Sequence, residues 1–178
     1  LQFYTGMWRQ TGALKTAEVP RALLLATVLQ VLFQSTSSSY CGRLADRVGN
    51  LRVIRVLLWI EAFIPLVAWA LAGVSPFRDE WGWFLGVFCL VGLRFPMYQL
   101  LVNYLLEAVP QEDHAMALGS VTVVQVVLAP APFFLGQVAT WLGYPAAMVL
   151  GSLLGVIGAY LALGLREVRE PRAAYGAT

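Results

Sequence analysis

Residues 42–54 have the sequence GRLADRVGNLRVI, a short charged segment between two apolar runs that are each long enough to cross a membrane. Gly42 and Gly49 permit the close helix approach and tight reversal that other residues resist. Asp46 and Arg47 lie between them, where a carboxylate and a guanidinium at a membrane surface can pair with each other, with lipid phosphate or with helix ends. We therefore expect a loop here that joins two antiparallel membrane helices.

The charges of this segment also predict its side of the membrane. Loops rich in Lys and Arg stay in the cytoplasm, and the segment is the most basic short loop of the chain. The expected inner residues are Arg43, Arg47, Arg52, Arg55, Arg166, Arg169 and Arg172, and the outer ones are Arg9, Lys15, Arg21 and Arg78. We expect an integral protein of the cell (inner or plasma) membrane with this segment and the carboxyl terminus in the cytoplasm.

The overall composition is that of a membrane protein. Hydrophobic residues make up 59% of the 178 residues and charged residues 12%, compared with about 25% charged in an ordinary soluble domain. The mean hydropathy is +0.70. A net charge of +2 is too small to indicate nucleic-acid binding. The class excluded is therefore a soluble or nucleic-acid-binding domain.

The residues that catalysis or metal binding would need are scarce. Cys41 and Cys89 are far apart in apolar surroundings, and His114 is the only histidine. This pattern argues against a disulfide, a metal site or a histidine-based triad. We expect no cofactor, no metal and no catalytic residues, so the chain is not predicted to be an enzyme.

Apolar runs predict the architecture, an all-α polytopic membrane helix bundle without a sheet. A span needs about 20 mainly apolar residues. The five expected spans cover residues 21–41, 53–73, 84–106, 115–139 and 144–165, which together form a bundle over 21–165. Residues 1–20 are interpreted as the end of a truncated helix and an outer loop. Trp81 and Trp83, just before the third span, are expected at the outer membrane interface. Residues 166–178 are interpreted as a cytoplasmic tail.

Polar side chains inside the spans are candidates for lining a cavity, because at that depth they must face protein or water rather than lipid. The candidates are Gln30, Gln34, Tyr98, Gln99, Asn103 and Gln125. Serines and threonines at 35–39 have an equally favoured alternative, in which each hydroxyl bonds to its own helix. Gly151, Gly155 and Ala159 form a stripe of small residues, and Gly158 with Ala162 forms a second, as in helices that pack closely.

Glu61 and Arg94 are the formally charged residues in the middle of spans. Glu61 lies about 13 Å along its helix from Arg52, near the middle of the bilayer. A lone charge there costs about 2.5 to 3.5 kcal/mol on insertion scales. Each should therefore have a partner or a water-filled path, and a direct pair between the two is one of the alternatives.

Gly-x-Leu-Ala-Asp-Arg-x-Gly at residues 42–49 resembles the loop signature of the major facilitator superfamily of secondary transporters. Its residues here are Gly42, Leu44, Ala45, Asp46, Arg47 and Gly49. The family usually has two consecutive basic residues after the second glycine, whereas this chain has Asn50 and Leu51, with the charge displaced to Arg52 and Arg55. Residues 42–52 are called the signature segment below. Arg94 followed by Pro96 and a charged loop also resembles the tenth, or the fourth, helix of that family.

The resemblance implies an alternating-access carrier built from two six-helix halves. Four spans follow the signature segment, which fits helices eight to twelve of the carboxyl-terminal half, and helices two to six of the first half are the alternative. By resemblance, Asp46 makes a charge contact that biases which side of the carrier is open, unless it merely pairs with Arg43 or Arg47. Arg94 then faces the cavity, and Glu61 supports the bundle.

We therefore expect the transport of a small solute by a secondary active carrier, of which this chain is one half. Its partners would be the lipid bilayer, the missing other half and a small-molecule solute, with or without a coupling proton or ion. The alternative is a non-transporting membrane module, receptor-like or degenerate. An intramembrane enzyme would need a catalytic pair or metal ligands, which the sequence does not supply.

Overall fold

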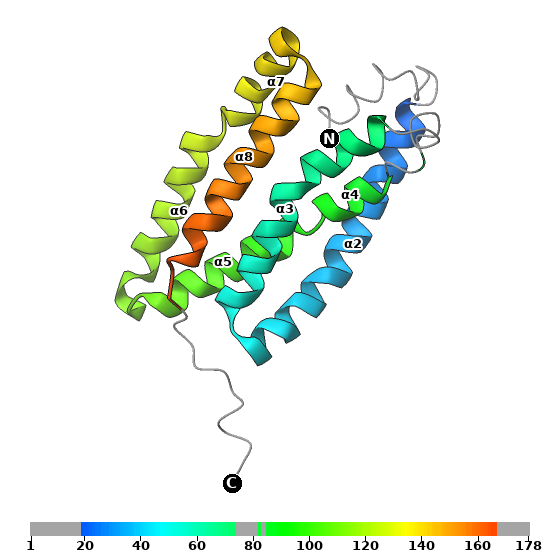
Figure 1. Cartoon of the computed structure of the whole chain (residues 1–178). Coiled ribbons are helices and arrows are strands. Elements are labelled where there is room, and N and C mark those ends of the chain that lie inside the picture. Colours follow the sequence, from blue (N-terminus) through cyan, green and yellow to red (C-terminus); the bar gives the residue numbers. More distant parts are fainter. Residues whose placement is uncertain (1–18, 74–81, 83–84, 167–178) are drawn as a thin grey trace.

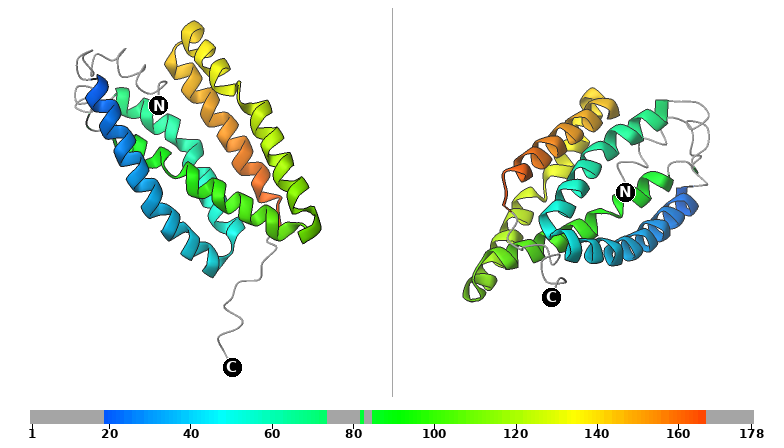
Figure 2. Two further views of the ribbon diagram at one scale, coloured as in Figure 1. Left: turned by 180° about the vertical axis from the view of Figure 1, so that it is seen from behind. Right: turned by 60° about the horizontal axis from the view of Figure 1, so that its bottom comes forward.

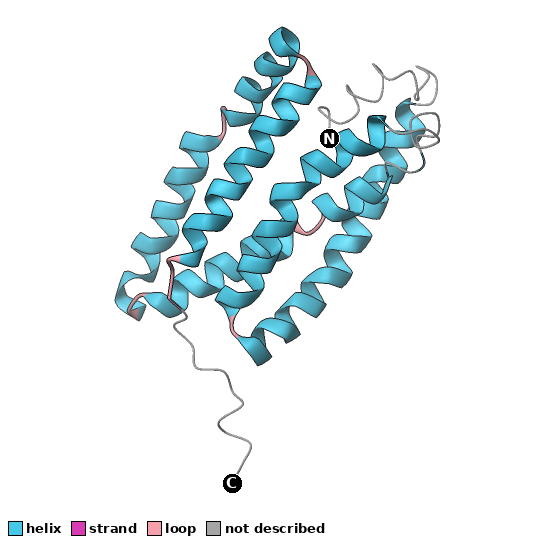
Figure 3. Cartoon of the chain, in the orientation of Figure 1, coloured by secondary structure: helices cyan, strands magenta, loops and turns pink. Residues whose placement is uncertain are grey.

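The computed structural model describes residues 19–73, 82 and 85–166. This part of the chain is helical and contains no strand (Figure 3). Within the described residues, five helices, counting broken ones as single spans, are long and apolar enough to cross a membrane. The chain is therefore a helical membrane protein, and the predicted all-α bundle is confirmed. Several expectations lie outside the described residues: the truncated helix before residue 19, the tryptophans at 81 and 83, and the tail after residue 166.

The first two helices meet at a single glycine. Helix α2 runs over Val19–Val48 and helix α3 over Asn50–Gly73 (Figure 1). Gly49 between them has a φ of 98°, and its N–H donates to the Ala45 carbonyl oxygen at 2.9 Å. Glycine adopts this left-handed conformation without the strain that a Cβ causes, so it commonly ends a helix.

The expectation of a loop between the spans, over residues 42–52, is wrong, because every residue of this range except Gly49 is helical. Leu, Ala and Arg are good helix formers, so the charged residues extend α2 instead of interrupting it. A Cβ added at Gly42 would meet nothing within 4 Å, so no close helix approach requires this glycine. Gly49 alone makes the reversal.

The third span is broken in its middle. Helix α4 covers Leu85–Val91 and helix α5 covers Arg94–Ala108. Pro96 has no N–H to donate back into the preceding turn, and the chain turns at Gly92 and Leu93. A Cβ on Gly92 would lie 2.9 Å from the backbone oxygen of Gln30. The break is therefore also a place where the backbones of α2 and the third span approach closely.

The fourth span is likewise divided, at Ala129 and Pro130. It comprises the short helix η3 (Gln111–Asp113), α6 (His114–Leu128) and α7 (Ala131–Leu142). Helix α8 follows over Tyr144–Leu163, after Gly143 with a φ of 86°.

The first span is longer than the expected range 21–41. Helix α2 begins at Val19 and ends at Val48, because the charged residues of the signature segment continue the helix.

Helix α3 holds the bundle together, because it packs against α2, α4, α5 and α8. Figure 2 shows α6, α7 and α8 on one side of the bundle and α2 and α4 on the other. Gly155 of α8 lies so close to α3 that an added Cβ would be 2.8 Å from Ala62 Cα. Its stripe partner Ala159 is fully buried, whereas a Cβ on Gly158 would meet nothing. The tight approach is thus made at Gly155; at Gly151 the nearest atom to an added Cβ would be 4.0 Å away, and of the second stripe only Ala162 is buried.

Buried apolar side chains form two clusters along the bundle. One includes Phe88, Ala68 and Met148 near the start of α2, and the other includes Leu57, Ile54 and Leu100 near Gly49. Helix α6, by contrast, has no buried residue among the described ones, although its composition is apolar. A face of this kind is stable only against lipid or further protein.

Candidate functional site

Polar residues from three spans border one pocket in the middle of the bundle. Its volume is about 550 Å³, within the range of small-molecule sites. Helix α2 contributes Gln30 and Gln34, the third span contributes Arg94 and Tyr98, and α6 contributes Gln125. Each of these residues lies near the middle of its span. The pocket thus brings together, near the middle of the helices, side chains that are far apart in the sequence.

The helix break places Arg94 at this pocket. Arg94 is the first residue of α5 and its side chain is exposed, while Pro96 two residues later is buried. Gly92 lines the pocket as well, and its missing side chain lets α2 come close enough to present Gln30 and Gln34. A guanidinium has five N–H donors and keeps its charge at any physiological pH. The pocket therefore contains a permanent cation surrounded by neutral amides and a phenol.

One atom of the pocket wall lacks a hydrogen-bond partner within the described part of the chain. Gln30 Oε1 is buried and accepts no hydrogen bond. Leaving a buried acceptor unpaired costs about 1–3 kcal/mol, so this amide oxygen is a locally unfavourable point of the pocket wall.

Glu61 and Arg94 do not form an ion pair in the described part of the chain. The charge of Arg94 nevertheless acts on the Glu61 carboxyl group, which is half-buried on α3 and does not line the pocket. Arg94, unlike Glu61, lines the pocket.

The remaining polar candidates lie elsewhere. Gln99 and Asn103 are exposed on α5 and do not line this pocket. Hydroxyl groups of α2 bond to their own helix, as the alternative foresaw: Ser38 donates to the Gln34 carbonyl oxygen at 2.7 Å and Thr36 to that of Leu32 at 3.0 Å. Hydroxyls bonded in this way need no further partner. The glutamines, whose side chains are longer, are the groups of α2 that reach the pocket.

A second group of polar residues ties the helices together at one end of the bundle. This loop end holds Gly49, the connection from α5 to η3, and residues 163–166 (bottom of Figure 1). Arg55 donates from Nε to the Ala162 carbonyl oxygen at 3.1 Å, and from Nη2 to those of Leu163 and Leu165 at 3.0 and 2.7 Å. The last carbonyls of a helix lack internal donors and carry partial negative charge. Arg55 thus caps α8 from α3.

Two further contacts complete the loop end. The buried amide of Asn50 donates from Nδ2 to Glu107 Oε2 at 2.9 Å, and the Tyr104 hydroxyl donates to the Arg166 carbonyl oxygen at 2.8 Å. The sequence showed Asn50 as a departure from the resembled signature but did not indicate its partner, which is 57 residues away. Asn50 therefore acts here as a hydrogen-bond donor that links the α2–α3 turn to the end of α5.

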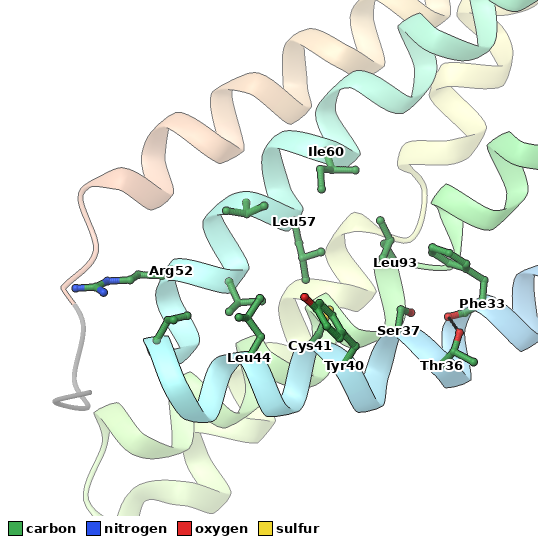
Figure 4. A pocket seen from close by; sticks show the side chains of 13 residues that line it. Phe33, Thr36, Ser37, Tyr40, Cys41, Leu44, Arg52, Leu57, Ile60 and Leu93 are labelled. Carbon is green, nitrogen blue, oxygen red and sulfur yellow. Dashed lines mark hydrogen bonds between the residues drawn. The ribbon is translucent and has the colours of Figure 1, made fainter. Parts of the chain in front are cut away.

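Residues of the signature segment border two other pockets. The larger, of about 510 Å³, lies between α2 and α3 and is lined mainly by apolar side chains, with Arg52 among them (Figure 4). The smaller, of about 200 Å³, is lined by Tyr40, Arg43, Leu44 and Arg47. Asp46 is exposed on α2. In the described part of the chain, no group of three or more His, Cys, Asp or Glu side chains could hold a metal ion.

Comparisons with protein-family models, with curated proteins and with solved structures find no match for this chain.

Proposed function

We propose that this chain is one half of an alternating-access carrier of the major facilitator type, which moves a small solute across a membrane by secondary active transport. The observation that supports this proposal most directly is the pocket around Arg94. It is of small-molecule size, it lies near the middle of the membrane-length helices, and its wall contains a cation and three amide side chains. The signature segment supports the proposal by sequence resemblance.

The free-energy cost of a charge inside a membrane favours a water-filled path at Arg94 over a purely structural role for this residue. A charged side chain in the middle of a membrane is costly unless it faces protein or a water-filled cavity. Arg94 is exposed, and it forms no ion pair with Glu61 in the described part of the chain. Water or a polar solute in the pocket would solvate its guanidinium.

The broken third span is a further feature typical of transporters, whose binding sites often lie at interrupted helices near the bilayer midplane. In the proposed carrier, the other half would close the open side of the pocket and cover the apolar surface of α6, which is entirely unburied in the described residues. The loop end would then face the cytoplasm, in accordance with the excess of arginines there.

The competing proposal is a membrane module that transports nothing. The test compares small solutes, measured by mass spectrometry, inside and outside cells that express the full-length protein, its Arg94→Gln variant or no protein. We expect at least one polar solute to change its distribution with the wild type and not with Arg94→Gln. Arg21→Gln, which removes an exposed arginine outside the pocket, is the matched control and should behave as wild type.

Two results would contradict the proposal. Solute profiles identical to those of cells without the protein would favour the non-transporting module, provided that the protein is present in the membrane. A solute change that persists in Arg94→Gln would show that transport does not depend on this pocket.

A further inference from the structure

The apolar pocket between α2 and α3 has the form of an open groove that ends at charged residues. Leu44, Cys41 and Tyr40 of α2 and Leu57 and Ile60 of α3 line it (Figure 4). Two of the lining side chains are largely exposed, Tyr40 at 69% and Val56 at 59%. The groove therefore opens on the outer surface of the bundle within the described part of the chain, and it does not share a lining residue with the pocket around Arg94.

Three arginine side chains lie at or beside one end of this groove. Arg52 lies at the loop end of the row of lining residues, and its guanidinium points away from the apolar side chains (Figure 4). The neighbouring small pocket shares Tyr40 and Leu44 with the groove and adds Arg43 and Arg47. All three arginines are exposed. Asp46 on the same stretch offsets one of these charges, which leaves an excess of positive charge.

This arrangement matches the parts of a phospholipid in the correct order. An apolar groove at membrane depth suits an acyl chain, and arginines at the membrane surface bind phosphate through paired N–H donors. Arg52 also lies in the first turn of α3, where the free amide groups favour an anion. We propose that this groove binds an anionic phospholipid, with one acyl chain along α2 and α3 and the headgroup phosphate at Arg52 and Arg47.

Charge complementarity distinguishes this occupant from an ordinary surrounding lipid. Each basic residue close to an anionic membrane surface contributes about 1 kcal/mol, which is about fivefold in affinity. A zwitterionic lipid would fill the apolar groove equally well but gain less at the arginines. The site should therefore select phosphatidylglycerol over phosphatidylcholine with the same acyl chains.

The test measures lipid binding to the purified full-length protein by native mass spectrometry, with phosphatidylglycerol or phosphatidylcholine added to the detergent. Wild type should retain phosphatidylglycerol preferentially. The double variant Arg47→Gln with Arg52→Gln should lose most of that preference, about 25-fold if the two contributions add. Arg21→Gln removes one exposed arginine from the opposite end of α2 and should leave the preference unchanged.

A second pair of variants tests the groove itself. Val56→Trp places a large ring in the groove from an exposed position, so it should weaken retention of both lipids while the protein stays folded. Val67→Trp, at a position of the same helix that is 41% exposed and outside the groove, should not. A melting curve for each variant separates loss of the lipid from loss of the fold.

The proposal would be overturned by equal retention of the two lipids in the wild type, or by a preference that survives loss of both arginines. It would also be overturned if Val56→Trp, but not Val67→Trp, dissociated a dimer or released another segment of the protein, since the occupant would then be protein. None of these outcomes depends on whether the chain transports a solute.

Discussion

Replacing Gly155 by alanine should push α3 and α8 apart. An added Cβ would lie 2.8 Å from Ala62 Cα and 3.0 Å from Ala62 Cβ, whereas ordinary van der Waals contacts lie between 3.4 and 4 Å. The first of these atoms belongs to the backbone of α3, so a side-chain rotation cannot relieve the contact. Inserting a methyl group into a packed interface costs about 1–3 kcal/mol.

Gly158 is the matched control, because it is in the same helix and a Cβ there would meet nothing within 4 Å. Alanine favours a helix over glycine by about 1 kcal/mol, and both variants gain this term. Gly158→Ala should therefore be neutral or slightly stabilising. Since the shared term cancels, Gly155→Ala should have a free energy of unfolding about 1–3 kcal/mol below that of Gly158→Ala.

Unfolding in mixed micelles by titration with sodium dodecyl sulfate, followed by circular dichroism, measures this difference. Equal free energies for the two variants would refute the close packing of α3 and α8. A lower stability for Gly158→Ala than for Gly155→Ala would show that the other stripe of small residues forms the interface.

Three further predictions concern contacts along the bundle. Arg55→Gln should lower the free energy of unfolding by about 1–3 kcal/mol, because the charge-assisted bonds to the end of α8 are lost, and Arg55→Lys should recover part of it in the same titration. A double-mutant cycle on Asn50→Ala and Glu107→Ala should give a coupling energy of about 0.5–3 kcal/mol, and additive effects would contradict the hydrogen bond between them. Gly92→Ala should destabilise the protein by about 1–3 kcal/mol, because its Cβ would be 2.9 Å from a backbone oxygen of α2, and a melting point unchanged from wild type would refute that approach.

The sequence predicts the number of spans and the helical class well because both depend on local properties. A run of about 20 apolar residues must satisfy its backbone hydrogen bonds internally in lipid, and only a helix does so within one segment. The breaks are harder to predict. Pro96 is a local sign of the break in the third span, but the close approach of α2 at Gly92 is a tertiary contact and leaves no local pattern.

The signature segment illustrates the opposite error. A charged stretch between apolar runs indicated a loop. Leu, Ala and Arg are good helix formers, however, so they continue the helix. Helix α2 ends only at Gly49, which has a positive φ. Depth in the membrane was sufficient to select Gln30, Gln34 and Gln125 as candidates. It did not separate them from Gln99 and Asn103, because helical rotation relative to the neighbours decides which face reaches the pocket.

Water access to the pocket around Arg94 tests the proposed carrier most directly, and it needs no knowledge of the solute. Single cysteines replace Gln34, Gln125 or Leu154 in a protein whose Cys41 and Cys89 are changed to alanine, and a membrane-impermeant thiol reagent is applied from each side in turn. Leu154 is 55% exposed near the middle of α8 and lines none of the three pockets, so it serves as the lipid-facing control. Alternating access predicts that cysteines at 34 and 125 react from both sides and that the cysteine at 154 does not. Cysteines at 34 and 125 that are as unreactive as the one at 154 would contradict a solute path through this pocket.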